Sequence, residues 1–382
     1  MNQSPKKPNE TRPDWAPDQP DDAFAVRVVS GVDGGHDGLP ASAPRDAAQA
    51  SSKRRPDLSV EDHVKGVLAN ERTVLARTIT LIESASPHHQ QKARAVLEQL
   101  LPHAGRSIRV GVSGVPGAGK STLIEALGMY LISQGHRVAV LAVDPSSTVT
   151  RGSILGDKTR MEQLSREPNA FIRPSPSGGT LGGVARKSRE TITACEAAGY
   201  DVILMETVGV GQSEITVRSM VDFFMLVLIA GGGDELQGIK KGIIEITDAV
   251  VINKADGDNI QRAKLAVADY ARALHWLKPA TRGWETTAYR CSAVTGEGIS
   301  DLWETILRFG KITRENGQFD ERRRQQTVEW VRQMIADHLM DAFYHHEAVK
   351  SMLDEVDSQV QSGSLLPSAA VDRLLGAFRS GS

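Results

Sequence analysis

The sequence has little of what marks secreted, membrane-spanning or nucleic-acid-binding proteins. Its 382 residues include only two cysteines, Cys195 and Cys291, which are far apart and lie in apolar surroundings. A disulfide framework is therefore not expected, and both cysteines are predicted to be reduced core residues. No apolar run approaches the roughly 18 residues that a membrane-spanning helix needs. The net charge of −2 gives no electrostatic basis for binding nucleic acid or an anionic membrane.

The N-terminal segment also lacks targeting features. It has neither the basic start nor the apolar core of a secretory signal. It carries several acidic residues, which argue against a mitochondrial transit peptide, so we expect a cytoplasmic protein. Residues 1–57 are rich in Pro, Asp, Ser, Ala and Gly, a composition that predicts a disordered N-terminal tail. The tail ends in a basic stretch, Lys53-Arg54-Arg55-Pro56, for which a solvated charge run is favoured over an address or a contact.

Two regions without chemical motifs flank the centre of the chain. Residues 58–105 show apolar residues near helical spacing, interrupted at Ser86-Pro87, which predicts an N-terminal helical hairpin. Residues 311–382 also have helical periodicity, with a break at Gly363–Pro367 before a last short helix. For this C-terminal region we expect a structural or dimer-forming extension. One of its apolar stripes consists of Val328, Val331, Met334, Ile335 and Leu339.

Residues 106–310 alternate short apolar runs with helical stretches. Unbroken apolar runs bounded by turn residues are typical of strands that are covered on both faces. The pattern therefore predicts an α/β domain with a mostly parallel central sheet flanked by helices. The expected strands are Ile108–Ser113, Val138–Val143, Val202–Glu206, Phe223–Ile229, Ala249–Asn253 and a weaker one near Tyr289–Ser292.

A phosphate-binding loop follows the first expected strand. Gly114–Ser121, "GVPGAGKS", fits the pattern G-x-x-x-x-G-K-S/T and opens a helical stretch. Glycines at these positions let backbone N–H groups approach phosphates at a helix N-terminus, and the lysine reaches the β- and γ-phosphates. The serine hydroxyl is a ligand for Mg²⁺. The loop identifies a P-loop NTPase, and its predicted nucleotide-binding residues are Gly114, Gly117, Ala118, Gly119, Lys120, Ser121 and Thr122.

A second motif favours guanine over adenine. Asn253-Lys254-Ala255-Asp256 follows the strand that begins at Ala249, and N-K-x-D at this place is a guanine-recognition loop. The Asp256 carboxylate would accept hydrogen bonds from guanine N1–H and the 2-amino group, whereas adenine has no such pair of donors. Ser292 and Ala293 follow the next strand, where a backbone N–H would contact guanine O6. GTP and GDP are therefore the expected nucleotides.

Acidic residues are expected beside the phosphates. Asp144 and Glu206 follow or end expected strands, and the carboxyl ends of parallel strands face the ligand crevice. Asp157 lies on a loop that could move with nucleotide state. We expect Ser121, Asp144, Asp157 and Glu206 to form the magnesium site, and Lys120, Glu206 and Asp157 to act in hydrolysis.

The segment after Glu206 differs from that of a regulatory G protein. Gly209 can bring its N–H to the γ-phosphate, but Val210 stands where a catalytic glutamine would follow. This predicts slow intrinsic hydrolysis that a partner accelerates by ordering the loops around Asp157 and Gly209–Glu214.

Together the motifs resemble one family, the MeaB-type G-protein chaperones of adenosylcobalamin-dependent acyl-CoA mutases. The resemblance covers roughly Val64 to Ala293, more loosely the C-terminal helices, and departs at Arg151 and in the tail before Leu58. It rests on the ordered stretches "GVPGAGKST", "LAVDPSS", "RGSILGDKTRM", "ETVGVGQSE", "GGGDELQGIKKGI" and "NKAD".

The resemblance implies a GTPase chaperone that gates adenosylcobalamin loading of a mutase and protects it. Methylmalonyl-CoA mutase is the first choice of partner, while ethylmalonyl- and isobutyryl-type enzymes stay open. It also implies a homodimer formed through the C-terminal helices. The stretch Gly231–Lys241 would communicate nucleotide state to the mutase. Its signalling residues would be Asp234, Glu235, Gln237, Lys240 and Lys241.

Three other interpretations remain. A P-loop kinase acting on a transport protein lacks support from the guanine loop. A metallochaperone GTPase needs grouped soft or imidazole ligands, but adjacent histidines such as His88-His89 and His345-His346 diverge by about 100° on a helix. An inactive scaffold is disfavoured because the nucleotide motifs are intact.

Overall fold

The computed structural model describes residues 57–143, 161–174, 181–207, 213–231 and 241–380, without the side chains of residues 181, 182 and 241. By its contacts, Leu58–Ser382 forms one unit and Met1–Asp57 another. The predicted N-terminal tail, except Asp57, therefore lies outside the described residues.

The centre of the fold is a seven-stranded sheet in the order β3-β2-β4-β1-β5-β6-β7. Every pair of neighbouring strands is parallel, which confirms the predicted class. The short strand β3 was not predicted, because four residues at a sheet edge give too little pattern. The bounds are β1 Ile108–Gly114, β2 Val138–Val143, β3 Ala170–Arg173, β4 Val202–Thr207, β5 Phe223–Ile229, β6 Ala249–Asn253 and β7 Thr287–Arg290.

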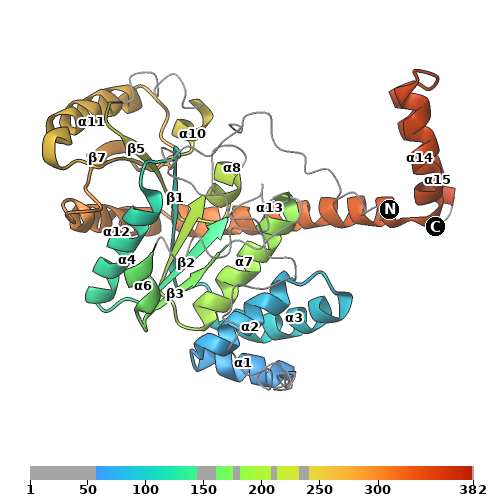
Figure 1. The fold of residues 1–382 in the computed structure, drawn as a ribbon, viewed down its shortest axis with the longest axis horizontal. Helices are drawn as coiled ribbons and strands as arrows, with labels where there is room; N and C mark the ends of the chain where they lie inside the picture. Colours follow the sequence, from blue (N-terminus) through green and yellow to red (C-terminus); the bar gives the residue numbers. More distant parts are fainter. Residues whose placement is uncertain (1–56, 144–160, 175–180, 208–212, 232–240, 381–382) are drawn as a thin grey trace, which may run out of the picture. The chain divides into compact units, whose positions relative to one another are not determined.

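Helices cover both faces of the sheet, so the strands are apolar along their whole length. Helices α4 (Lys120–Ser133) and α12 (Ile299–Glu315) pack on one face, with α6 (Glu162–Arg166) beside α4. The opposite face carries α7 (Leu181–Ala197) and α8 (Ser213–Arg218) (Figure 1). Next to them, α11 (Ile260–His275) and α10 (Lys241–Glu245) cover β5 and β6. Cys195 and Cys291 are both buried and unpaired, as predicted.

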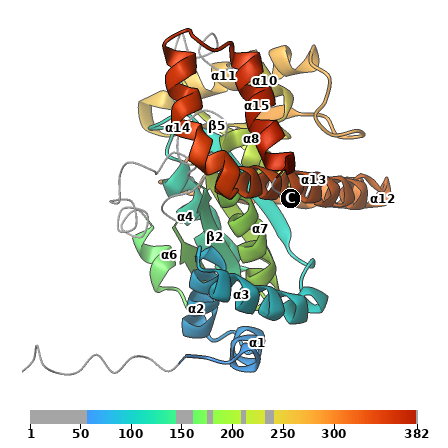
Figure 2. The same ribbon diagram turned by 90° about the vertical axis from the view of Figure 1, so that its right-hand side faces the viewer.

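The N-terminal extension has three helices where the sequence predicted a hairpin of two. They are α1 (Val60–Leu68), α2 (Arg72–Glu83) and α3 (Pro87–Leu100), and they pack beside α7 (Figure 2). The first predicted helix is divided at Asn70, whose φ of 56° is left-handed. The turn is close-packed, because a Cβ at Gly66 would lie only 2.6 Å from Val74. A short 3₁₀-helix η2, Leu101–His103, follows α3.

The C-terminal region is helical to the end of the described chain. It comprises α13 (Gln318–His345), α14 (Glu347–Gln361) and α15 (Pro367–Ser380). Most of the predicted apolar stripe on α13 is exposed: Val328 by 50%, Ile335 by 54% and Leu339 by 59%. In contrast, Val349 and Val356 of α14 are buried. In the part of the chain that is described, no helix is long and apolar enough to span a membrane.

Buried ion pairs tie the amino ends of the strands to the surrounding helices. Asp222, just before β5, accepts hydrogen bonds from Arg323 of α13 at 2.7 and 2.8 Å and from the Arg109 backbone N–H at 2.9 Å. Glu196 of α7 accepts two further hydrogen bonds from the Arg109 guanidinium, at 2.9 and 3.0 Å. Such pairs are costly to break when one partner is removed.

Candidate nucleotide-binding site

The phosphate-binding loop connects β1 to α4 at the carboxyl edge of the sheet, as predicted. Two of its glycines combine a positive φ with close neighbours that leave no room for a side chain. Gly114 has φ 148°, and a Cβ there would lie 2.0 Å from the Val227 carbonyl oxygen. Gly119 has φ 84°, and its Cβ would lie 2.7 Å from Asn253 Nδ2. The loop can therefore approach β5 and the β6 loop only because these positions are glycine.

Lys120, the first residue of α4, is almost fully buried. Its Nζ donates hydrogen bonds to the carbonyl oxygens of Gly114 at 2.9 Å and Val115 at 3.3 Å. The ammonium thus lies inside the curve of the loop. There it is held close to the backbone groups that cradle phosphates in loops of this pattern.

Glu206 lies beside the phosphate-binding loop because β4 is the neighbour of β1. The two strands are neighbours, as expected from the sequence, and their register pairs Val112 with Glu206. Glu206 is 5% exposed, and its Oε1 accepts a hydrogen bond of 2.8 Å from the Ser121 hydroxyl. A hydroxyl and a carboxylate in contact are oxygen donors of the kind that Mg²⁺ prefers, so these two groups fit the predicted metal site.

A second contact between the same strands was not predicted. The Thr207 hydroxyl donates to Ser113 Oγ at 3.0 Å, and both residues are fully buried. Ser113 precedes Gly114, and Thr207 follows Glu206, so this bond joins the ends of the two strands that carry the loop and the carboxylate. Only the register of β1 against β4, which a sequence does not contain, could have revealed it.

Asn253 connects the guanine loop to the phosphate-binding loop. It ends β6, and its Nδ2 donates to the carbonyl oxygens of Ala118 at 2.9 Å and Gly119 at 3.4 Å. Its Oδ1 accepts from the backbone N–H of Ala293 at 3.2 Å and from the Cys291 thiol at 3.6 Å. One buried amide therefore fixes three segments that are distant in the sequence.

Cys291 contributes to this arrangement, although the sequence suggested only a core residue. Burial raises the pKa of its thiol to about 12, so the thiol stays protonated and can donate to Asn253. Its position directly before Ser292 was the available signal. A lone buried cysteine more often packs than donates, which is why the pattern did not indicate this contact.

The rest of the guanine loop is held by side chains around Asp256. The Ser292 hydroxyl donates to Asp256 Oδ2 and accepts from the Thr295 N–H at 3.1 Å. Lys254 has a left-handed φ of 57°, and its carbonyl accepts from Asn259 Nδ2 at 2.8 Å. Asn259 ends the 3₁₀-helix η3, Gly257–Asn259. Ser292, Ala293 and Asp256 thus lie together, as predicted, while Thr295 and Asn259 are additional supports.

Part of the predicted site lies outside the described residues. Among the described residues, no three His, Cys, Asp or Glu side chains form a group suited to a metal. A larger acidic magnesium set therefore depends on the undescribed aspartates. The predicted residues that lie outside are Asp144, Asp157, Gly209, Asp234, Glu235, Gln237 and Lys240, together with the side chain of Lys241.

The chain matches one protein family over most of its length. Residues 75–348 match the family model described as methylmalonyl-CoA mutase-associated GTPase MeaB. A putative GTPase of Caulobacter vibrioides is 53% identical over 85% of this chain and 99% of its own length. The mitochondrial methylmalonic aciduria type A homolog of Mus musculus is 47% identical over 82% of this chain and 78% of its own. The GTPase ArgK of Escherichia coli is 44% identical over 83% and 96%.

A solved structure confirms the fold class. The crystal structure of a LAO/AO transport system kinase superposes with a TM-score of 0.68 at 37% identity, and the match covers 85% of this chain and 99% of that one. The P-loop and the parallel sheet are those of a P-loop NTPase. With the family match, they make this chain a guanine-nucleotide-binding GTPase. The chain belongs to the family of methylmalonyl-CoA mutase-associated GTPases of the MeaB type.

Proposed function

We propose that this GTPase gates adenosylcobalamin loading of a cobalamin-dependent acyl-CoA mutase and protects that enzyme from inactivation. Methylmalonyl-CoA mutase is the proposed partner, because the family description names it and the mouse relative is a methylmalonic aciduria type A homolog. The proposed place of action is the cytoplasm. The observation that carries the site assignment is the contact between Ser121 and Glu206 at the end of the phosphate-binding loop.

The described residues would divide the chemistry of GTP hydrolysis among them. Lys120 would exchange its loop carbonyls for the β- and γ-phosphate oxygens, which form stronger, charge-assisted hydrogen bonds. Ser121 and Glu206 would hold Mg²⁺, which neutralises developing charge on the phosphates when bound. Glu206 would also orient the attacking water, directly or through a second water, because it is the penultimate residue of β4 and lies beside the loop. Asp144 and Asp157 would complete the acidic set.

Guanine recognition would come from the loop that Asn253 braces. Asp256 would accept from the base, while the Ala293 N–H would exchange its present acceptor, Asn253 Oδ1, for guanine O6. The Ser292 hydroxyl already donates to Asp256 and so restricts the orientation of its carboxylate. Residues 231–241 are the proposed route by which nucleotide state reaches the mutase.

We also propose that the protein forms a homodimer through its C-terminal helices. The exposed stripe on α13, Val328, Val331, Ile335 and Leu339, repeats at intervals of three and four residues and so lies on one face of the helix. An apolar face of this length is typical of an interaction surface. Val331→Glu with Ile335→Glu should convert a dimer into a monomer, as measured by light scattering. A wild-type protein with monomer mass would contradict this part of the proposal.

The experiment that tests the mutase assignment is a GTP hydrolysis assay of the purified protein, alone and with methylmalonyl-CoA mutase. We expect a slow basal rate that rises strongly with the mutase, because the partner would order the loops around the phosphates. The Glu206→Ala variant should remove the accelerated rate, whereas Glu304→Ala, an exposed glutamate of α12, should behave as wild type. If the hydrolysis rate does not change when methylmalonyl-CoA mutase is added, the partner has to be sought among other acyl-CoA mutases.

A further inference from the structure

Helix α13 is attached to the end of α8 by one buried glutamine. Gln326 is 8% exposed, and its Nε2 donates to the carbonyl oxygens of Val221 at 2.9 Å and Arg218 at 3.3 Å. Arg218 is the last residue of α8. Along the 28 residues of α13, only Phe319 and Gln326 are buried, and this amide attaches the helix to the GTPase domain together with the bonds of Arg322 and Arg323.

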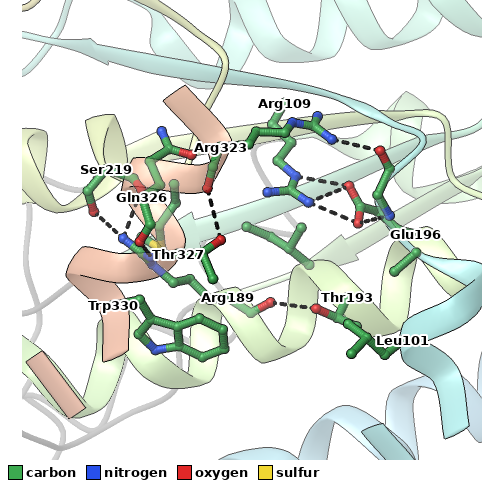
Figure 3. A pocket seen from close by; sticks show the side chains of 14 residues that line it. Leu101, Arg109, Arg189, Thr193, Glu196, Ser219, Arg323, Gln326, Thr327 and Trp330 are labelled. Carbon is green, nitrogen blue, oxygen red and sulfur yellow. Dashed lines mark hydrogen bonds and ion pairs between the residues drawn. The ribbon is translucent and has the colours of Figure 1, made fainter. Parts of the chain in front are cut away.

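Arg189 of α7 joins the same place from the other side (Figure 3). Its guanidinium donates to the backbone carbonyl of Gln326 at 2.6 Å. It also donates to the backbone carbonyl and the hydroxyl of Ser219, both at 2.8 Å. The Trp330 ring of α13 lies 5.6 Å from this guanidinium. Burial lowers the pKa of Arg189 to about 10. Helices α7 and α13 therefore meet the end of α8 at Arg189, Gln326 and Ser219, which is the residue directly after α8.

A buried carboxylate forms a second connection between the same helices. Asp248 is fully buried, and its Oδ2 lies 3.6 Å from both Arg218 of α8 and Arg322 of α13. Burial, and then the like charge of Arg218, lower the pKa of Arg322 to about 10. Arg218 is thus connected to α13 in two ways. Its backbone carbonyl accepts from Gln326, and its side chain pairs with Asp248, which also pairs with Arg322.

Hydrogen bonds hold this joint together at the border of two surface pockets. Two pockets that open to solvent, of about 280 and 300 Å³, adjoin it, and both are lined by Arg189, Ser219 and Trp330. Within the described residues, neither Arg189 Nε nor Trp330 Nε1 has a hydrogen-bond partner, although both atoms are buried. Unsatisfied buried donors are unfavourable, so a rearrangement of the joint that gave these atoms partners would recover part of its own cost.

Helix α8 is, in contrast, packed tightly against the strand that carries the phosphate-binding loop. Val217 of α8 is fully buried. A Cβ on Gly111 of β1 would lie 3.0 Å from it and 2.7 Å from Phe224. β1 leads directly to the loop at Gly114, and α8 follows β4, which bears Glu206 and ends at Thr207. A displacement of α8 would therefore reach both the loop and the end of β4.

We propose that Gln326 and Arg189 are positioning residues for GTP hydrolysis: through α8 they couple the joint of α13 to the loop that binds phosphate and to Glu206. Nucleotide state then changes the surroundings of Trp330, and the attachment of α13 sets the hydrolysis rate. The coupling rests on the GTPase activity of the family and on the assigned site. It is independent of the mutase.

Adjacent glutamines provide a matched pair of variants. Gln326→Ala removes the two amide bonds to Arg218 and Val221, whereas Gln325→Ala changes an exposed glutamine whose side-chain bond lies within α13, to Glu321 at 2.8 Å. In single-turnover hydrolysis without mutase, we expect Gln326→Ala to slow the reaction about three- to tenfold at unchanged GTP affinity. Gln325→Ala should match wild type. Arg189→Lys, which keeps the charge but loses the forked donors, provides a second variant if Gln326→Ala does not fold.

Trp330 provides a readout that would not respond to the bound nucleotide if Gln326 and Arg189 only stabilised the fold. Its fluorescence, identified by subtraction of the Trp330→Phe variant, should differ between the GDP-bound protein and the protein with a non-hydrolysable GTP analogue. This difference should be lost in Gln326→Ala and Arg189→Lys and kept in Gln325→Ala. Identical Trp330 emission in both nucleotide states, with equal hydrolysis by Gln326→Ala and Gln325→Ala, would overturn the proposal. Because no mutase is present, failure of the mutase assignment would not affect this result.

Discussion

The parallel strands begin at one edge of the sheet, its amino edge, and end at the other, its carboxyl edge. The two edges use polar side chains in different ways. At the carboxyl edge, Lys120 and Asn253 bond to the backbone of loops, and glycines let those loops approach each other. At the amino edge, carboxylates such as Glu196 and Asp222 are paired with arginines that come from other strands and helices. One edge therefore shapes a concave backbone surface, while the other joins elements of the fold.

This difference indicates which residues act in nucleotide binding and turnover and which ones stabilise the fold. A ligand that binds at the ends of parallel strands meets the carboxyl edge. Substitutions there should change nucleotide binding or turnover and leave unfolding nearly unchanged. Substitutions that break the ion pairs of Glu196 or Asp222 at the amino edge should do the reverse, whereas turnover is proposed to depend on the neighbouring joint at Gln326 and Arg189. Four experiments test this separation.

Lys120→Ala should have the largest effect. Removing the ammonium loses about two charge-assisted hydrogen bonds to phosphate, roughly 3–6 kcal/mol of binding, so tight GTP binding should disappear. Isothermal titration with GTP measures the affinity, and thermal unfolding without nucleotide should show little change. Lys264→Ala, at an exposed position of α11, serves as the control. Wild-type affinity in Lys120→Ala would remove this residue from the site.

Glu196→Ala should be the corresponding break at the amino edge. It leaves the Arg109 guanidinium, 19% exposed, without its buried partner, and such losses cost about 3–5 kcal/mol of stability. Denaturant unfolding measures the effect. Glu297→Ala, which breaks an exposed pair with Arg290, should cost at most about 1 kcal/mol. Equal losses in the two variants would contradict the proposed division between the edges.

Glu206→Ala should separate binding from turnover within the carboxyl edge. GTP affinity should stay close to that of wild type, because Lys120 and the loop backbone remain. Hydrolysis should fall about 100-fold, as when a group that stabilises or orients in the transition state is lost. Single-turnover rates, measured with and without the mutase, check this expectation. Unchanged turnover in both conditions would show that another residue orients the water.

Much of this architecture could be predicted from the sequence. The apolar runs located six of the seven strands, and the order of the motifs along the chain indicated which loops meet. The contacts that fix the site were not predictable, because they depend on register and on the approach of distant backbones. The bond from Cys291 to Asn253 and the pair of Thr207 with Ser113 are examples. The same holds for Gln326, one polar residue within a long polar helix.

The division of the first predicted helix at Asn70 shows a second reason why part of the structure could not be predicted from the sequence. Apolar spacing continues across the break, so periodicity alone predicts one helix. A left-handed residue and the contact of Gly66 with Val74 decide otherwise. Local sequence therefore predicted the kinds of element well, while tertiary contacts fixed where elements end and which side chains meet.

Asp256→Asn should give the smallest of the four effects and the most specific one. The carboxylate accepts two hydrogen bonds from guanine in the proposed complex, whereas an amide presents one acceptor and one donor. GTP affinity should fall by about 1–3 kcal/mol. Xanthosine triphosphate, which carries a carbonyl in place of the 2-amino group, should bind the variant better than it binds wild type. Asp258→Asn, at an exposed neighbouring position, should leave both affinities unchanged. If Asp256→Asn kept the full preference for GTP over ATP, guanine recognition would have to be assigned to the backbone around Ala293 instead.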